Sequence, residues 1–296
     1  MSRLALGALI LMWATMAAGQ RVPARDLIAQ PLGLTGEAAA LGGGAASGFW
    51  NPATALLADG ERMRIAAAAL NSPIELAFAA QLVHVAFAFP AVGTVSASVA
   101  HAAVNDLVRT DTDPQSIGGD IPYLTTLVSA GVARRLSAHV AGGFALRWHW
   151  GRADAARSSA LAADAGVVID RVTRVDARVA LSSFMLTANA ANAPVLVAAT
   201  DVRVAGHDSV RTVRAGVSYA RQRGARAEWY PYADARYSRL SVRGGPVYSV
   251  GYGASEWRFR LGLALQQAGY SIGIAREDNA GGLSPTYQLT VANIRR

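Results

Sequence analysis

Charged residues that alternate with apolar ones are the first candidates for chemistry in this chain. They are Arg147, Asp164, Asp170, Arg174, Asp176, Arg178, Arg258 and Arg260. Successive side chains of a β-strand point to opposite faces, so these charges would share one face and gather in an enclosed interior. There they would either pair across strands and fill the space, or line a path that favours anions, because arginines outnumber acids in this set.

Enzymatic chemistry finds little support in the remaining polar residues. The chain has neither a Gly-x-Ser-x-Gly nucleophile elbow nor a phosphate-binding loop. A hydrolase inside a barrel could use His139 or His149 with Ser182. The single argument for this combination is that the strand alternation would place these side chains on the inward face. We therefore expect that the protein is not an enzyme and uses no cofactor. We also expect no metal site. The chain has five histidines, and none of them has a second ligand residue at the spacing of a metal site. They are His84, His101, His139, His149 and His207.

The elements that must position these charges are β-strands. From Trp257 to Gln266 every large apolar side chain falls on one face, and two arginines, a glycine, an alanine and a glutamine fall on the other. The same alternation returns in about 14 segments. Long polar loops are expected at 105–122, at 151–159 and around Asn189. The expected strands are 63–70, 81–89, 94–104, 123–133, 138–150, 161–169, 175–184, 196–204, 210–221, 227–237, 240–252, 257–265, 269–275 and 285–292.

The start of the chain indicates export. Met1–Arg3 is a short basic region, residues 4–14 are apolar, and the small residues Ala17–Gly19 form a cleavage site, so residues 1–19 are interpreted as a signal peptide. The apolar run is short compared with the ~20 residues of a membrane-spanning helix. The chain has no cysteine, which rules out disulfide bonds and a lipid anchor on cysteine.

Composition also narrows the partners. The chain has no lysine, so all 28 basic residues are arginine, and the formal net charge is +8. A basic chain can bind nucleic acid. Here the arginines are interleaved with apolar residues rather than clustered, and we expect no nucleic-acid partner.

Two architectures fit the alternation: a soluble all-β fold with its apolar face inside, and a membrane barrel with its apolar face outside. Export, mixed charges on the inward face, and the strand-end tryptophans Trp148, Trp150 and Trp257 favour the barrel, whereas many small outward residues count against it. We predict an all-β fold, an antiparallel transmembrane β-barrel of about 14 strands with an N-terminal plug segment. The barrel spans residues 61–296 and contacts the lipid of the bacterial outer membrane.

Residues 20–60 differ from the barrel, because they are rich in glycine and alanine and contain the motif Phe49, Trp50, Asn51, Pro52 and Ala53. Asn51 precedes proline and is therefore kept out of helical conformation, and its side chain can hydrogen-bond nearby backbone. A barrel of this size has an interior that side chains alone do not fill, so this segment is the expected plug. Whether it moves as a gate or closes the barrel as a fixed turn stays open.

The glycine-rich run 37–45 followed by 49–56 resembles the N-terminal signature of the PorV/PorQ-like family of outer-membrane β-barrels, which is related to the FadL-type transporters. The resemblance would cover residues 33–296, although the matching residues lie only in 37–56. The chain departs from the family pattern in two ways. It lacks the usual acidic spacer before Asn-Pro-Ala, and it ends Ile294-Arg295-Arg296 rather than in an aromatic residue.

The resemblance implies a hatch that contains Asn-Pro-Ala and a barrel that passes small hydrophobic molecules across the outer membrane. The alternatives are a non-transporting barrel that acts as an adaptor in protein secretion or surface attachment, and a plain structural barrel. A transporter needs kinked strands, for which Pro231 and Gly244–Pro246 are candidates. An adaptor needs apolar loop tips that bind a secreted protein, and the candidates in 105–122 are Leu107, Val108 and Ile117.

Overall fold

The computed structural model describes residues 21–73, 75–110, 116–172, 176–187, 194–206, 211–222, 226–251, 254–279 and 283–295. The predicted signal peptide, Arg174 and His207 therefore lie outside the described residues. Among the described residues, none of the helices has the length and apolar character needed to cross a membrane.

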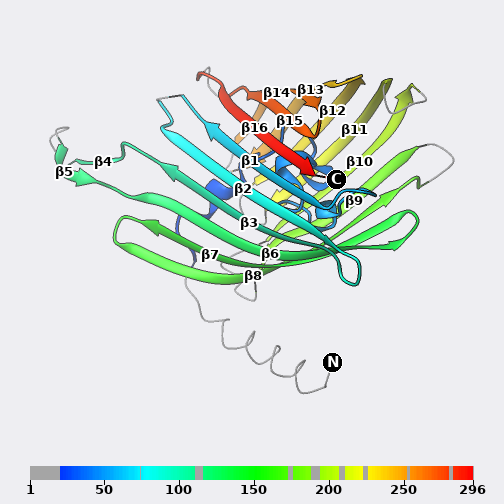
Figure 1. Ribbon diagram of the computed structural model, residues 1–296. Coiled ribbons are helices and arrows are strands. Elements are labelled where there is room, and N and C mark those ends of the chain that lie inside the picture. The colour runs from blue at the N-terminus through cyan, green and yellow to red at the C-terminus, as the bar shows by residue number, and fades with distance from the viewer. Residues whose placement is uncertain are drawn as a thin grey trace.

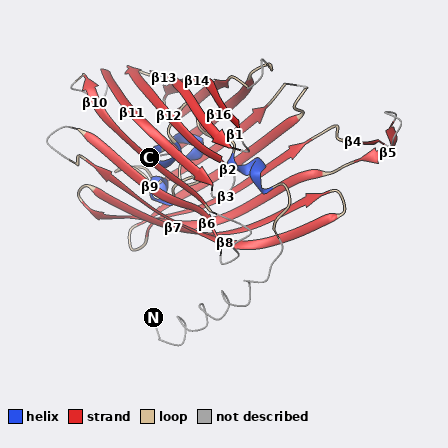
Figure 2. Cartoon of the chain, turned by 180° about the vertical axis from the view of Figure 1, so that it is seen from behind, coloured by secondary structure: helices blue, strands red, loops and turns tan. Residues whose placement is uncertain are grey.

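The strands form one closed antiparallel barrel (Figures 1 and 2). Its 14 strands follow the chain order, and β1 closes the ring by pairing with both β2 and β16. The predicted antiparallel all-β barrel and its strand number are thereby confirmed. The strands are β1 (Met63–Asn71), β2 (Phe78–Phe89), β3 (Gly93–Val104), β6 (Tyr123–Ser137), β7 (Val140–Ala153), β8 (Ala156–Asp170), β9 (Ala177–Leu186), β10 (Val195–Ala205), β11 (Arg211–Gln222), β12 (Arg226–Tyr237), β13 (Leu240–Gly251), β14 (Ala254–Gln267), β15 (Tyr270–Glu277) and β16 (Thr286–Arg295).

The two long loops expected in the first half of the barrel have different outcomes. The loop 105–122 exists and carries a small two-stranded sheet of β4 (Val108–Thr110) and β5 (Ser116–Asp120). The loop 151–159 was a wrong prediction, because β7 and β8 stay paired up to Ala153 and Ala156. Strands pair through backbone hydrogen bonds, which do not depend on side-chain polarity. The pairing of β7 and β8 therefore continues past the apolar part of the strands, into residues that are polar on both faces.

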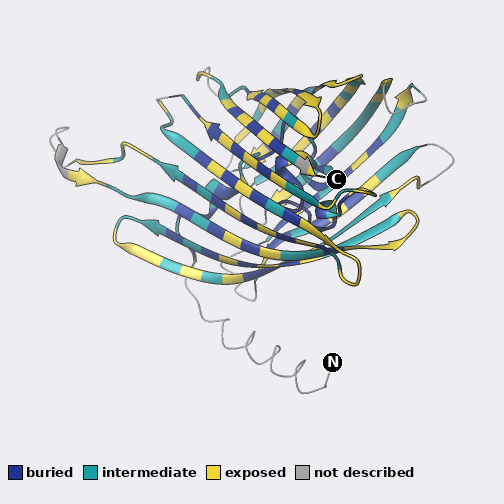
Figure 3. Cartoon of the chain, viewed as in Figure 1, coloured by how far each residue is buried: buried dark blue, intermediate teal, exposed yellow. Residues whose placement is uncertain are grey.

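The apolar face of the barrel points outward, as the alternation predicts (Figure 3). The outward residues of β14 from Trp257 to Leu265 are all exposed, and their neighbours Arg258 and Arg260 are not. Tyr219, Trp229, Tyr248 and Trp257 stand directly opposite one another on four neighbouring strands, and so form a row of aromatic side chains. A barrel that meets lipid carries such rows where its strands leave the apolar layer.

The two ends of the barrel differ. The terminal end, where β1 begins and β16 ends, carries the short turns 90–92, 138–139, 238–239 and 268–269. The opposite end, here called the loop end, carries the long loop 105–122 as well as the short turn 154–155. The aromatic row described above lies near the loop end, and Phe89, Tyr237 and Tyr270 are exposed near the terminal end.

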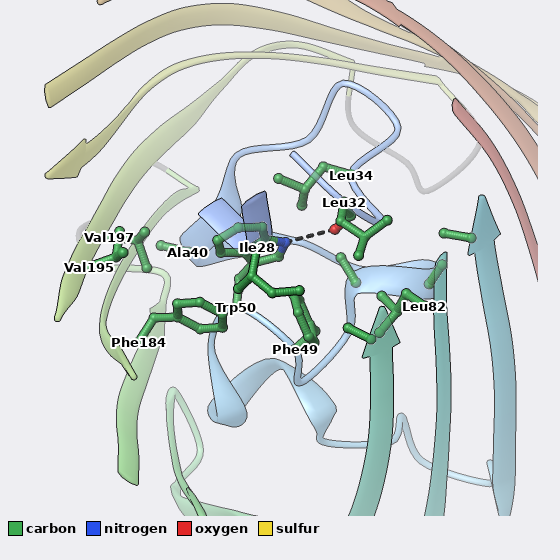
Figure 4. Packing of buried hydrophobic residues seen from close by; sticks show 14 of the residues in the cluster. Ile28, Leu32, Leu34, Ala40, Phe49, Trp50, Leu82, Phe184, Val195 and Val197 are labelled. Carbon is green, nitrogen blue, oxygen red and sulfur yellow. Dashed lines mark hydrogen bonds between the residues drawn. The ribbon is translucent and has the colours of Figure 1, made fainter. Parts of the chain in front are cut away.

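Residues 21–57, called the N-terminal segment below, lie inside the barrel (Figure 4). The segment is built from short 3-10 turns: η2 (Arg25–Ala29), η3 (Ala39–Leu41), η4 (Gly44–Ala46) and η5 (Pro52–Ala55). Its apolar residues make a buried core with inward-facing wall residues, among them Ile28, Leu32, Phe49, Trp50, Leu82, Phe184 and Val197. The interior of the barrel is thus a packed core over much of its width.

Candidate functional site

The motif Phe49–Ala53 forms a buried turn inside the barrel. Asn51 has extended backbone angles, as expected before proline, and its side-chain oxygen accepts a hydrogen bond from the Ala53 N–H at 3.0 Å. Its amide nitrogen donates to the Ala40 carbonyl at 2.8 Å and points to the Val167 carbonyl of β8 at 3.4 Å. The Asn51 side chain therefore ties two parts of the N-terminal segment to each other and to the wall.

The wall accommodates this turn because it lacks side chains there. Gly143 of β7 and Gly166 of β8 are paired, and both lie against the turn. A Cβ atom at Gly143 would lie 2.4 Å from the Ala53 nitrogen, and one at Gly166 would lie 2.0 Å from the Asn51 side-chain oxygen. The same relation holds at other wall glycines that contact the N-terminal segment, namely Gly151, Gly262 and Gly273.

A buried ion pair holds the turn from the other side. Arg147 donates to the carboxylate of Asp164 and to the Phe49 carbonyl, and both charged side chains are fully buried. Asp164 also accepts the Met185 N–H at 2.6 Å, at an irregularity in β8–β9 pairing where both Phe184 and Met185 are buried. The pair therefore contacts both the wall and the N-terminal segment. The Arg147 guanidinium lies between the aromatic rings of Phe49 and Phe184.

Those rings form a cluster at the centre of the interior. The Phe184 ring stacks on Trp50 at 4.8 Å between centroids and meets Phe49 edge-on at 5.5 Å. The Arg147 guanidinium lies 4.5 Å from the centre of the Phe184 ring. The Trp50 indole N–H donates to the Leu32 carbonyl at 2.8 Å, which satisfies the one polar group of that ring (Figure 4).

Residues 33–37 are fastened to the opposite side of the wall. The Gln288 side chain of β16 accepts from the Gly33 N–H at 2.7 Å and donates to the Leu34 carbonyl at 2.7 Å. The Thr35 and Thr290 hydroxyls are 2.9 Å apart. The remaining two contacts are a hydrogen bond of 2.7 Å from the Tyr230 hydroxyl to the Gly36 carbonyl, and an ion pair of 2.6 Å between Glu37 and Arg243.

The charged residues predicted from the sequence occupy several places. Arg147 and Asp164 pair with each other, whereas Arg258 and Arg260 pair with Glu228 and Glu277. Arg178 binds Asp201, and Asp176 binds Arg203 and Arg214 near the terminal end. Asp170 is the last residue of β8 and is exposed at the rim.

The sequence interpretation did not single out the partners Asp201, Glu228 and Glu277. The register of the strands determines which charges pair. Arg178 stands directly opposite Asp201, and Arg260 stands directly opposite Glu277. Among the described residues, no three His, Cys, Asp or Glu side chains are placed to hold a metal ion.

Cavities between the N-terminal segment and the wall strands β9–β14 include three in the described part of the chain, of which the first two adjoin each other. The loop-end cavity has a volume of about 140 Å³ and contacts Asp26, Leu27, Val195 and Arg226. The middle cavity, about 40 Å³, shares Val195 and Arg226 with it and adds Trp50 and Tyr230. The terminal-end cavity, about 370 Å³, begins at Glu37 and Leu41 and is lined largely by arginines and acids.

The middle cavity is the smallest of the three. A cavity of about 150 Å³ is known to hold benzene, and a single water molecule needs only ~10–15 Å³. The middle cavity, at about 40 Å³, therefore has room for water but not for an aromatic ring in this conformation. A ring could enter it only if Trp50, Tyr230 or the segment itself moved.

Comparison with known proteins shows the fold. No protein-family model and no curated protein matches the chain. Among solved structures, the monoaromatic hydrocarbon channel CymD aligns with a TM-score of 0.55 at 10% identity, over 93% of this chain and 97% of its own. The Pseudomonas putida toluene transporter TodX aligns with a TM-score of 0.53 at 10% identity, over 90% and 98%. The Ralstonia pickettii toluene transporter TbuX gives 0.50 at 12% identity, over 91% and 97%.

At these identities the likeness shows the fold alone. The chain has the fold of bacterial outer-membrane β-barrels, and its similar structures include channels for small aromatic molecules.

Proposed function

We propose that this protein is an outer-membrane channel for small hydrophobic molecules, in which the N-terminal segment acts as a plug. The observation that carries the proposal is the pair of adjoining cavities beside the segment, of which the inner one, lined by Trp50 and Tyr230, is too small for an aromatic ring. The names of the similar structures, a monoaromatic hydrocarbon channel and toluene transporters, support small aromatic molecules as the cargo. The proposed role is passage without chemical conversion, in a barrel of FadL type related to the PorV/PorQ-like family.

The two ends give the proposed orientation. Bacterial barrels have short periplasmic turns and longer outer loops. The terminal end, with the turns 138–139, 238–239 and 268–269, would then face the periplasm, and the loop 105–122 would face outward. A hydrophobic molecule would enter at the loop-end cavity and meet the closed middle cavity next.

An interruption in the pairing of β12 and β13 supports lateral exit of the hydrophobic molecule from the middle cavity through the barrel wall. The β12–β13 pairing is interrupted between Trp229–Tyr248 and Ala233–Gly244. Counting from these pairs places Pro231 opposite Pro246, and neither proline has an N–H to donate. Pro231 and Pro246 are exposed on the lipid side, and Tyr230 beside them lines the middle cavity. The candidate kinks predicted from the sequence therefore meet at one place.

A disulfide tether tests whether the segment must move. The Thr35 and Thr290 hydroxyls touch, and the natural chain has no cysteine, so Thr35→Cys with Thr290→Cys places two thiols together without competing pairs. Cells that carry the oxidised double variant should take up labelled toluene no faster than cells without the barrel. Reduction should restore uptake to the wild-type rate.

The matched control is a tether inside the wall. His101 and Thr126 are opposite each other on β3 and β6 and are hydrogen-bonded at 2.8 Å. His101→Cys with Thr126→Cys should leave uptake unchanged when oxidised. If cells with the oxidised Thr35–Thr290 tether take up toluene at the wild-type rate, the segment stays fixed during transport. If cells with the wild-type barrel take up toluene no faster than cells without the barrel, the transport proposal is wrong.

The second candidate function is an adaptor in protein secretion or surface attachment. It is favoured by the β4–β5 sheet, which projects beyond the rest of the barrel at the loop end and exposes Val108 (Figure 1). The side chain of Ile117 lies outside the described residues. Deletion of 105–122 should abolish capture of a secreted partner and leave toluene uptake intact. The reverse result would contradict the adaptor role.

A further inference from the structure

The terminal-end cavity differs from the other two in its chemistry. It is the largest of the three, at about 370 Å³, and exceeds the ~150 Å³ that hold a benzene ring. Five arginines contribute to its lining, together with only three acids. The arginines are Arg178, Arg203, Arg214, Arg236 and Arg243. Covering these guanidinium groups with a molecule that accepts no hydrogen bond costs free energy, so the surface favours a ligand with acceptor oxygens.

The acids around the cavity hold the arginines in fixed positions. Asp201 accepts from Arg178 at 3.0 and 2.5 Å and from Arg214 at 2.9 Å. Arg243 is held by Asp234 at 2.9 Å and by Glu37 of the N-terminal segment at 2.6 Å. A guanidinium has five N–H donors, and these pairs use only some of them. The remaining donors are therefore oriented before a ligand arrives.

One arginine of the cavity lining has no ion-pair partner. Asp176 adds a fourth acid to the group through Arg203 and Arg214, and Asp170 stands directly opposite Arg178 as a fifth. In the described part of the chain Arg236 makes no ion pair with any of these acids. Arg236 lies near the end of β12, beside the Arg243 cluster, and is only partly exposed. Among the five arginines of the lining, Arg236 is therefore the one that makes no ion pair in the described part of the chain.

We propose that the terminal-end cavity is a binding site for small organic anions, with Arg236 as the residue that provides the unpaired charge. A carboxylate fits because a guanidinium binds it through two parallel hydrogen bonds. The ring or chain attached to the carboxylate would extend toward Leu41, which also lines the cavity. The proposed ligand differs in class from the hydrophobic cargo. The proposal of an anion site therefore does not depend on whether the barrel carries toluene.

Calorimetric titration of the purified full-length barrel in neutral detergent tests the proposal. Benzoate and benzyl alcohol have nearly the same size and differ in charge, so benzoate should bind and benzyl alcohol should not. Added NaCl should weaken benzoate binding, because chloride competes and screens. Inorganic phosphate, titrated in parallel, tells whether the site needs a carboxylate or accepts any small anion.

Arg236→Gln should weaken benzoate binding about tenfold, the effect of losing one charge-assisted hydrogen bond. The matched control is Arg109→Gln, which removes the same charge from an exposed ion pair with Asp154 at the loop end. The control should bind benzoate like the wild type. Equal binding of benzoate and benzyl alcohol, or equal weakening by the two substitutions, would overturn the proposal. Because this assay measures no transport, its failure would leave the channel proposal untouched.

Discussion

Gly143 of β7 and Gly166 of β8 lie directly opposite each other, and the turn from Asn51 to Ala53 occupies the space that two side chains would fill. A methyl group at Gly166 would meet the Asn51 side-chain oxygen, which is held by the Ala53 N–H and cannot withdraw without losing that bond. The glycine pair therefore makes the wall complementary to the N-terminal segment.

The first prediction concerns this pair. Gly166→Ala should lower the free energy of unfolding by about 1–3 kcal/mol, the usual cost of overpacking a filled interior. Urea unfolding in detergent micelles measures the change. Gly142→Ala on the neighbouring strand β7 is the control, since its methyl group would meet only the flexible end of Leu136. Equal effects of the two substitutions would show that the turn does not depend on the glycine pair.

The second prediction concerns the buried ion pair of Arg147 and Asp164. Asp164→Asn leaves a buried guanidinium without its counter-charge and should cost about 3–5 kcal/mol of unfolding free energy. The double change Arg147→Met with Asp164→Leu should cost less, because it leaves no unpaired charge. The same urea unfolding measures both variants.

The exposed pair of Arg109 and Asp154 serves as the control for this comparison. Asp154→Asn should change stability by only about 0–1 kcal/mol, as is usual for surface pairs. A double variant at Arg147 and Asp164 that is less stable than Asp164→Asn alone would contradict the interpretation. In that case the hydrogen bond from Arg147 to the Phe49 carbonyl would be the larger contribution.

Most of the wall was predictable from the sequence. Apolar side chains that alternate with polar ones fix both the strands and the face they turn outward, and β14 shows this most clearly, from Trp257 to Leu265. The polar ends of β7 and β8 were not predictable in this way, because Arg152 and Arg157 are paired strand residues without apolar neighbours on a lipid face. Backbone pairing extends the two strands there, and the Arg152 side chain adds a hydrogen bond of 3.1 Å to the Asp154 carbonyl.

The site was predictable only in part. Asn51 before Pro52 indicates a turn with a side-chain hydrogen bond, and that bond is present. Which charges pair depends on register, and register is readable only across a tight turn. Counting back from the turn 268–269 places Glu277 opposite Arg260, so this partner could have been found. No such turn connects Arg178 to Asp201, and the contacts of the N-terminal segment follow from no local pattern at all.

The third prediction concerns the interrupted pairing between β12 and β13. Pro231→Val with Pro246→Val restores two N–H donors where the pairing is interrupted. Two added backbone hydrogen bonds should raise the free energy of unfolding by about 1–3 kcal/mol. If hydrophobic cargo leaves the barrel here, toluene uptake should fall at the same time.

The matched control for this wall repair is Pro285→Val. Pro285 precedes β16 and lies outside the β12–β13 interruption. Uptake should not change in that variant. A repaired wall that is more stable and still takes up toluene at the wild-type rate would place the exit elsewhere, and the terminal-end cavity would be the remaining route.

The last prediction concerns Arg25, a buried cation at the loop end whose side chain donates a hydrogen bond of 3.1 Å to the Met185 carbonyl and makes no ion pair with the described residues. Burial, with a smaller contribution from the charge of Arg21, lowers the pKa of Arg25 to about 10. The folded chain thus holds this proton less tightly than the unfolded chain does. The charge therefore opposes folding at every pH below about 10, and the opposition fades as the pH rises above about 10.

Arg25→Met should accordingly raise the free energy of unfolding at neutral pH, by the relief of the buried charge less about 1 kcal/mol for the lost hydrogen bond. Arg25→Lys keeps the charge and should give no gain. A loss of stability in Arg25→Met equal to that in Arg25→Lys would mean that water or an anion already compensates the guanidinium. A gain in the methionine variant alone would mean that Arg25 is kept at a cost, beside the cavity where cargo is proposed to enter.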